Sequence, residues 1–274
     1  ARGSAHMGVL RALEAAGIAY EMMAATSIGA LAGLMHCSGH SADYMIDACK
    51  RELMPSWWLS RLPGGSYLHM MRLLKPGGIA NKVRKYVGND CQLQDLPTPL
   101  YITATDLVAG DLVVQDQGCA VTALMASMCL PGVVSPIAGE SGMLVDGGVL
   151  CNLPAKVLRE RGADIVIGVD ISSQANAIPE RPTRAATLSR SLQLLSRRRH
   201  EEDCAACDVV IRPDVSEFRF TAFTEVDDLA DAGSQATEAI MPQLRQLLGD
   251  YPFACPARET AESVYDDADT VISI

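Results

Sequence analysis

Hydrophobic and polar positions recur along the chain with two spacings, one helical and one extended. Val9, Leu10 and Leu13 have helical spacing and Gly17 is typical of a helix end, which predicts a helix over residues 4–16. The same pattern predicts further helices over residues 28–37, 41–53, 120–128, 152–162 and 230–248. Short apolar runs bounded by turn residues predict strands over residues 18–24, 99–107, 110–118, 142–148, 163–172 and 207–215.

The order of these elements predicts the fold class. Strands alternate with helices, which favours an α/β domain with a mostly parallel central sheet and helices on both faces. Residues 163–172 form a continuous apolar run, as expected for a strand that is covered on both sides. We expect one domain over residues 1–250 and an acidic, loosely held C-terminal tail over residues 251–274.

The segment from Met54 to Gly78 differs from its surroundings. It contains both tryptophans, Trp57 and Trp58, and is interrupted by two Gly-Gly pairs and three prolines. Two interpretations stay open: a lid or lipid-facing flap, or an ordinary packed insertion.

Composition restricts the classes of partner and cofactor. The formal net charge of −10, without a basic tail, argues against a nucleic-acid partner. The nine cysteines show no disulfide spacing, which favours reduced thiols and a cytoplasmic location. Cys204 and Cys207 form a C-x-x-C pair, but further metal ligands at matching spacing are missing, so a redox or metal protein is a minor hypothesis. No apolar run reaches the roughly 18 residues of a membrane-spanning helix.

Candidate chemistry begins at Ser27, between the strand predicted for residues 18–24 and the helix predicted for residues 28–37. A sharp strand-to-helix turn exposes a serine hydroxyl, and the residues that flank it must be small, as Ala25 and Gly29 are. The positive end of the helix would also favour negative charge at this point. Serine is equally a common helix N-cap, however, so this motif alone does not establish a nucleophile.

The sequence favours a carboxylate over His200 as the base that would activate Ser27. His200 is the only histidine late in the chain, and the charged run around it predicts a solvated helical face; the others are His6, His36, His40 and His69. Asp146 ends an apolar strand and precedes Gly147 and Gly148, which let other backbone approach closely. Asp106 and Asp170 also follow apolar strands and are alternatives with a structural role.

Four motifs, in this order, resemble those of the patatin-like phospholipase family: ARGSAHMGVLRALEAAGI, ATSIGALAG, ASMCLPGVVSPI and VDGGVLCNLPAKVLRERGAD. The pattern is similar to bacterial members and to the catalytic domain of neuropathy target esterase, and it extends from Ala1 to about Leu248. The resemblance implies a three-layer patatin-like fold and a Ser27–Asp146 dyad without histidine, metal or cofactor. It also implies that Arg2 and Gly3 belong to the end of an oxyanion loop.

The implied activity is hydrolysis of carboxylic esters in phospholipids or lysophospholipids, with transient contact at a membrane surface. Two departures from the family pattern weaken that expectation. The leading glycines of the oxyanion loop are not in the sequence, so we expect the first strand to be missing as well, and Ala25 replaces a glycine. The alternative is therefore a catalytically impaired lipid-binding or regulatory module.

Overall fold

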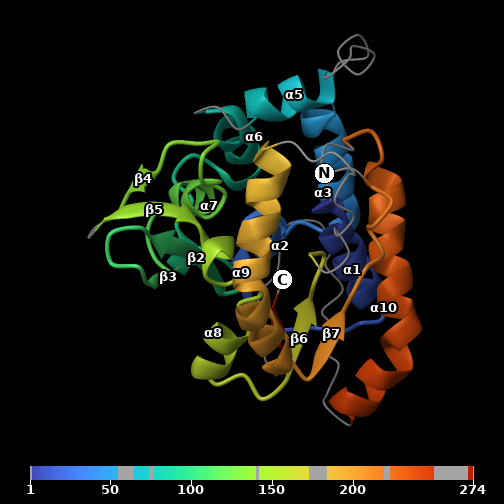
Figure 1. Cartoon of the computed structure of the whole chain (residues 1–274). Coiled ribbons are helices and arrows are strands. Elements are labelled where there is room, and N and C mark those ends of the chain that lie inside the picture. The colour runs from blue at the N-terminus through green and yellow to red at the C-terminus, as the bar shows by residue number, and fades with distance from the viewer. Residues whose placement is uncertain are drawn as a thin grey trace.

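The computed structural model describes residues 2–54, 65–73, 77–139, 142–172, 184–218, 223–249 and 271–273 (Figure 1). Its helices are α1 (Ser4–Ala15), α2 (Ile28–Cys37), α3 (Ala42–Leu53), α5 (Gly65–Leu73), α6 (Gly78–Val87), α7 (Ala120–Ser127), α8 (Ala155–Glu160), α9 (Arg184–Ala205) and α10 (Val226–Leu248), with two 3-10 turns, η1 (Leu93–Asp95) and η2 (Gly147–Val149). Its strands are β1 (Met22–Thr26), β2 (Leu100–Asp106), β3 (Leu112–Gln115), β4 (Ile137–Ala138), β5 (Met143–Asp146), β6 (Val166–Val169), β7 (Val209–Ile211) and β8 (Val271–Ser273).

The strands form one mixed sheet in the order β4-β5-β2-β1-β8-β6-β7, and β3 also pairs with β2. β1 pairs in parallel with β2 and β8, and β6 with β8 and β7. β2 pairs antiparallel with β3 and β5, and β4 pairs antiparallel with β5. The prediction of an α/β domain is confirmed. The prediction of a mostly parallel sheet is confirmed only in part, since a tight turn at Gly110 (φ +78°) makes β3 pair antiparallel with β2.

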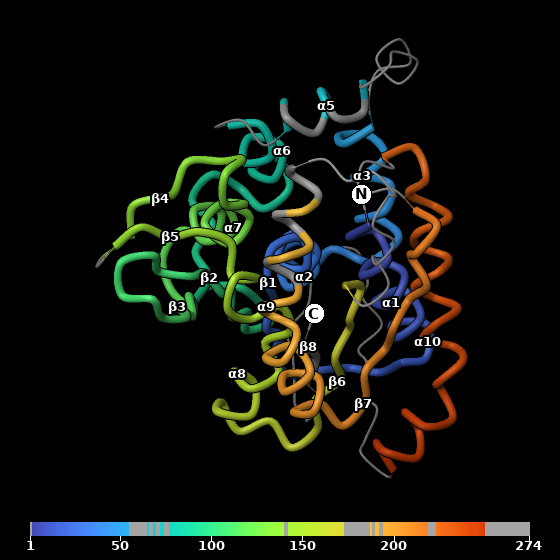
Figure 2. Tube along the Cα trace, in the orientation of Figure 1, coloured from blue at the N-terminus to red at the C-terminus, as the bar shows by residue number. Residues whose placement is uncertain are grey.

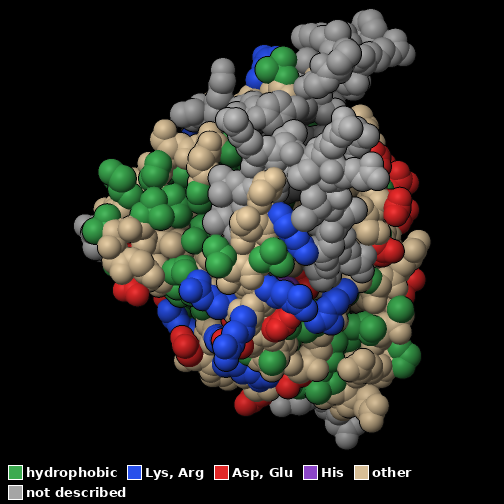
Figure 3. Space-filling view, in the orientation of Figure 1, with side chains coloured by type: hydrophobic (Ala, Val, Ile, Leu, Met, Phe, Trp, Pro, Cys, Tyr) green, Lys and Arg blue, Asp and Glu red, His purple; other side chains and the backbone are tan. Residues whose placement is uncertain are grey.

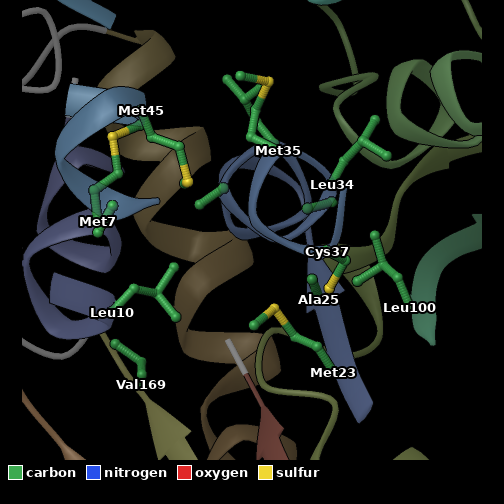
Figure 4. Close-up of a cluster of buried hydrophobic side chains, with 14 of the residues drawn as sticks. Met7, Leu10, Met23, Ala25, Leu34, Met35, Cys37, Met45, Leu100 and Val169 are labelled. Atoms are coloured by element: carbon green, nitrogen blue, oxygen red, sulfur yellow. The ribbon is translucent and has the colours of Figure 1, made fainter. Parts of the chain in front are cut away.

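Side chains of β1 enter two cores, one on each face of the sheet. Met23 and Ala25 belong to the larger core under α1, α2, α7 and α10, which Figure 4 shows around Leu34 and Leu100. Ala24 belongs to the second core, with Leu158 of α8 and other side chains. Because successive strand residues point to opposite faces, this alternation means that both faces of the sheet are covered, in a three-layer arrangement.

Helices α1 and α10 lie side by side along one flank of the molecule (Figures 1 and 2). A Cβ on Gly8 would lie 1.7 Å from the carbonyl oxygen of Ala230, and one on Gly233 would lie 2.0 Å from that of Ala5. The two glycines therefore permit a backbone approach that no side chain would allow. Ser234 adds a hydrogen bond from its hydroxyl to the Gly8 carbonyl oxygen, at 2.8 Å.

Several sequence predictions differ from the structure at the edges of the fold. The strand expected over residues 18–24 begins only at Met22. Our tail prediction fails for Val271–Ser273, because β8 lies between β1 and β6, inside the sheet (Figure 2). Within the segment expected to form a lid or insertion, α5 and the start of α6 are described, whereas Trp57 and Trp58 lie outside the described residues.

Other predictions hold closely. The helix of residues 28–37 has the expected bounds, and Ser41 caps α3 by accepting a hydrogen bond from the Tyr44 amide. The helix α6 was not predicted. None of the helices, within the part of the chain that the structure describes, combines the length and the apolar character needed to cross a bilayer.

Candidate active site

The register of the sheet brings the ends of β1 and β5 together on β2. Thr26, the last residue of β1, pairs with Thr103. Asp146, the last residue of β5, pairs with Ala104, the next residue along β2. β1 runs parallel to β2 and β5 runs antiparallel, so the two strands end at adjacent positions. Ser27 and Asp146 consequently approach each other although they are far apart in the sequence.

Ser27 occupies the sharp turn between β1 and α2. Its φ of 54° and ψ of −120° make it the only residue other than glycine with a positive φ among those described. Such a backbone is strained for an L-residue and is concentrated at functional sites. The predicted elbow is therefore present in the backbone itself, since Ser27 does not cap α2 with its side chain.

The hydroxyl of Ser27 instead faces Asp146. Ser27 Oγ donates a hydrogen bond to Asp146 Oδ2 at 2.5 Å. The other carboxylate oxygen, Oδ1, accepts a hydrogen bond from the Gly148 amide at 2.8 Å, which fixes the orientation of the carboxylate. Asp146 is 4% exposed, so its carboxylate is shielded from water, whereas Ser27 is partly exposed.

Burial changes the acidity of Asp146. It raises the pKa of this carboxyl to about 6, although the hydrogen bonds from Ser27 and Gly148 act in the opposite direction. A carboxylate with a pKa near neutrality is ionised at pH 7 and still basic enough to accept a proton from a hydroxyl. The environment thus suits Asp146 as a general base.

The two glycines after Asp146 have different functions. A Cβ on Gly147 would lie 2.7 Å from the Thr103 carbonyl oxygen and 2.4 Å from its hydroxyl oxygen, so only glycine fits against β2 there. Gly148 supplies the amide that holds the carboxylate. The Thr103 hydroxyl also hydrogen-bonds the Thr26 hydroxyl at 2.7 Å, so the end of β1 contacts the same residue of β2 as Gly147 does.

Ala25, the departure from glycine, is accommodated without strain. It lies within β1, is fully buried and does not have a positive φ. Its methyl group faces Gly33 of α2, because a Cβ on Gly33 would lie 3.3 Å from the Cβ of Ala25. Gly33 therefore provides the room that the Ala25 methyl group needs.

The remaining predicted residues lie around the start of α2. Gly29 is buried in the first turn of the helix, where backbone amides have no partner within the helix. Gly3 contacts Ile28, since a Cβ on it would lie 2.2 Å from Ile28 Cγ1. Arg2 does not point at the dyad: its guanidinium donates two hydrogen bonds, of 3.0 and 2.7 Å, to the Phe218 carbonyl oxygen.

Sequence reasoning missed Ser127 at the end of α7. Its fully buried hydroxyl accepts a hydrogen bond from the Ser27 amide at 2.7 Å. The serine lies in the ASMCLPG segment, but nothing in that segment alone indicates that it reaches the elbow.

The alternative carboxylates have other partners. Asp106 Oδ1 accepts hydrogen bonds from the amides of Val108 and Ala109, and so closes the β2–β3 turn. Asp170 forms an ion pair with His200, at 3.0 Å. The prediction of a solvated His200 is wrong, because its side chain is only 19% exposed. The hydrogen bond with Asp170 raises the pKa of His200 to about 10, so this imidazole is a cation rather than a base.

A shallow apolar hollow, with a cavity volume of about 40 Å³, lies between α1, α2, α3 and α6. Its lining includes Leu31, one helical turn along α2 from Ser27, and Ala48 of α3. Glu52 lies at its polar edge with Lys82, at 2.9 Å.

Comparisons with known proteins agree on the family. A family model described as patatin-like phospholipase matches residues 1–159. An uncharacterized NTE family protein of Mycobacterium tuberculosis is 27% identical over 268 residues, covering 88% of this chain and 45% of the relative. The human patatin-like phospholipase domain-containing protein 6 is 33% identical over 176 residues, covering 64% of this chain and 13% of the relative.

Two further matches extend the comparison. The lysophospholipase NTE1 of Mycosarcoma maydis is 30% identical over 234 residues, covering 85% of this chain and 12% of the relative. VipD from Legionella pneumophila has a similar fold, with a TM-score of 0.51 and 12% identity over 88% of this chain and 65% of that structure. The chain spans less than half the length of the relatives that it matches in sequence. The family model covers more than half of its residues, and the chain belongs to the patatin-like phospholipase family.

Proposed function

We propose that this chain is a serine lipid acyl hydrolase in which Ser27 is the nucleophile and Asp146 the general base. The observation that carries the proposal is the 2.5 Å hydrogen bond from Ser27 Oγ to Asp146 Oδ2 at the end of a strained turn. Its substrates are the carboxylic esters of phospholipids or lysophospholipids, consistent with the family and with a relative named as a lysophospholipase.

The reaction proceeds in two steps. Ser27 Oγ attacks the ester carbonyl carbon while its proton passes to Asp146. The tetrahedral intermediate collapses, the proton passes from Asp146 to the leaving alcohol, and the acyl group stays on Ser27. Water then attacks the acyl-enzyme, with Asp146 taking its proton and returning it to Ser27 Oγ as the fatty acid leaves. The residues that act in both steps need no metal and no cofactor.

Backbone amides around the start of α2 would stabilise the oxyanion. The Ser27 amide already donates its hydrogen bond to the Ser127 hydroxyl. The Ala30 amide bonds the Ser27 carbonyl oxygen, so the amides of Ile28 and Gly29 and the backbone at Gly3, which packs against Ile28, are the groups proposed for this role. Arg2 supports this loop through its bonds to the Phe218 carbonyl oxygen.

Surface charge supports transient contact with a membrane. The chain carries a net charge of −10, yet lysines and arginines gather over the lower part of α9 and its surroundings (Figure 3). Leu194 and Leu195 of α9 are 52% and 77% exposed. Basic and apolar side chains together suit the surface of an anionic bilayer. We place the protein in the cytoplasm, peripheral to the membrane, with no nucleic-acid partner.

The decisive experiment compares ester hydrolysis in three variants. We expect Ser27→Ala and Asp146→Asn each to lower kcat/KM for a lysophospholipid by about three orders of magnitude or more. Ser38→Ala is the matched control, since Ser38 lies at the other end of α2 and its hydroxyl donates to the Leu34 carbonyl oxygen. Equal activity in the wild type and Ser27→Ala would refute the proposal.

The alternative is a lipid-binding module with little turnover, motivated by the Ser27 amide, which donates its hydrogen bond to Ser127 rather than to the site. A fluorophosphonate probe separates the two, because it labels an activated serine but not an inert one. Labelling of the wild type that is lost in Ser27→Ala favours the enzyme. Binding of phospholipid vesicles without labelling favours the module.

A further inference from the structure

A second cluster of reactive side chains lies away from the dyad, where α9 meets the end of β6. Asp170 directly follows β6, and His200 and Cys204 lie one turn apart on α9. One ligand atom from each of the three lies within 4.8 Å of the other two. The C-x-x-C pair is thus divided, since Cys204 faces His200, whereas Cys207 Sγ contacts the Asp203 carbonyl oxygen at 3.8 Å.

Three groups converge on one ring nitrogen. His200 Nε2 lies 3.0 Å from Asp170 Oδ2, 3.2 Å from Ser172 Oγ and 3.6 Å from Cys204 Sγ. One N–H group cannot serve three partners well, whereas a cation among them could. The other ring nitrogen, Nδ1, is buried, so Nε2 is the atom that His200 presents to the cluster.

We propose that Asp170, His200 and Cys204 bind one Zn²⁺ ion. In a tetrahedral zinc site, bond lengths of roughly 2.3 Å to sulfur and 2.0–2.2 Å to nitrogen or oxygen place sulfur about 3.6 Å from nitrogen, and nitrogen about 3.3 Å from oxygen. The corresponding distances here are 3.6 and 3.0 Å. Mixed nitrogen, sulfur and oxygen donors suit zinc, and a water molecule completes the four ligands.

The groups around the three ligands also fit a cation. Ser172 donates hydrogen bonds from its amide and its hydroxyl to Asp170 Oδ1, at 2.8 and 2.6 Å, which leaves Oδ2 directed at His200. Such partners orient metal ligands. Arg212 Nε is 3.8 Å from Asp170 Oδ2, but its side chain is 48% exposed and can turn to solvent. Binding releases the thiol proton of Cys204 and the proton between His200 and Asp170, and the two anionic ligands then balance Zn²⁺.

The position of the site gives zinc a structural purpose. Among the α9 side chains whose burial the structure describes, only that of Asp203 is buried. Asp203 also forms a 3.3 Å ion pair with Lys156 of α8, so a described attachment of α9 to the rest of the fold is polar. A metal that joins two residues of α9 to Asp170 would fix the helix to the end of β6. This inference does not depend on the esterase activity.

The test uses the whole chain, stripped with a chelator and titrated with Co²⁺ as an optical substitute for Zn²⁺. We expect one equivalent of metal, tetrahedral d–d absorption and a thiolate-to-cobalt charge-transfer band. Cys204→Ser should remove that band, and His200→Gln should weaken Zn²⁺ binding by 100-fold or more. The control Cys207→Ser keeps the same C-x-x-C neighbourhood and should retain both the band and the affinity.

A fourth variant keeps the test decisive even if a ligand substitution impairs folding. Ser172→Ala leaves all three ligands in place but removes one of the two hydrogen bonds that orient the Asp170 carboxylate, so the band should persist while Zn²⁺ affinity falls about 10-fold. Zinc should also slow amide hydrogen exchange in α9 of the wild type. No metal uptake by the wild type, or a cobalt band unchanged in Cys204→Ser, would overturn the proposal. Fluorophosphonate labelling of Ser27 tests the esterase separately.

Discussion

The amide of Ser27 donates a hydrogen bond to the hydroxyl of Ser127 at 2.7 Å. This bond joins the strained turn after β1 to the end of α7, 100 residues further along the chain. It holds the backbone of the proposed nucleophile without using the Ser27 hydroxyl, which remains directed at Asp146. We therefore expect Ser127 to be a positioning residue that acts through the conformation of Ser27.

Removing that hydroxyl should affect both stability and rate. Ser127→Ala leaves the Ser27 amide without its partner in a buried site, which costs about 1–3 kcal/mol of unfolding free energy. We expect kcat to fall about tenfold with KM nearly unchanged, because the turn relaxes away from the reactive geometry. Ser127→Thr, which keeps the hydroxyl, should restore most of the rate. Stopped-flow acylation and denaturant unfolding measure the two effects, and an unchanged kcat in Ser127→Ala would refute the positioning role.

The sequence predicts the individual parts of this site better than their assembly. The elbow at Ser27 and the strand end at Asp146 follow from local patterns of small and apolar residues. Their meeting depends on the register of β1 and β5 on β2, at Thr103 and Ala104, which no local pattern encodes. Ser127 was missed for the same reason. His200 was predicted to be solvated because the residues around it are charged, and nothing in that run indicates its contact with Asp170.

The pH dependence of the rate should report the ionisation of Asp146. Its pKa is raised to about 6 by burial, and only the ionised form can accept the Ser27 proton. We expect kcat/KM to fall below pH 6, tenfold for each further unit, and to be level above about pH 7. Initial rates on a neutral short-chain ester, for which the substrate does not titrate, measure this. A profile that is flat from pH 8 down to pH 4 would contradict the role of Asp146 as the base.

The two glycines after Asp146 should respond differently to an added methyl group. Gly147→Ala places a Cβ 2.7 Å from the Thr103 carbonyl oxygen, which is backbone and cannot move aside. Gly148→Ala meets only side-chain atoms: the Asn152 oxygen at 2.8 Å, which can rotate away, and Asp146 Oδ1 at 3.0 Å, which a small shift of the carboxylate can relieve. We expect Gly147→Ala to lose at least 100-fold in kcat/KM and to lower Tm by several degrees, and Gly148→Ala to lose about tenfold or less. Equal losses in the two variants would show that the fit against β2 is unimportant.

The apolar hollow behind α2 should affect the choice of acyl chain. Ala48 lines it and is 4% exposed, so Ala48→Leu fills part of the space that an acyl chain would occupy. We expect kcat/KM for a long-chain ester to fall about tenfold, while that for an acetyl or butyryl ester changes less than twofold. Ala12→Leu on α1, outside the lining, is the control for general effects of added volume. A parallel loss on both substrates would mean that the hollow does not hold the chain.

Acid stability should reveal two buried groups that act in opposite directions. Burial lowers the pKa of His6 to about 4. Between pH 6.5 and 4, His6 is therefore protonated in the unfolded chain but neutral in the folded chain, and the free energy of unfolding falls as the pH drops through this range. The 2.5-unit difference corresponds to about 3 kcal/mol. The pKa of Asp146 is raised to about 6, so as the pH drops this carboxyl is protonated in the folded chain before it is protonated in the unfolded chain. Its protonation therefore increases the free energy of unfolding as the pH drops from 6 to below 4.

Because the two effects overlap, the wild type should show little net change across this window. We expect His6→Gln to become more stable relative to the wild type between pH 6.5 and 4, by about 3 kcal/mol, and Asp146→Asn to become less stable by a similar amount. Urea unfolding at half-unit pH intervals measures both differences. If the stability difference between His6→Gln and the wild type is independent of pH, His6 is not held neutral by burial.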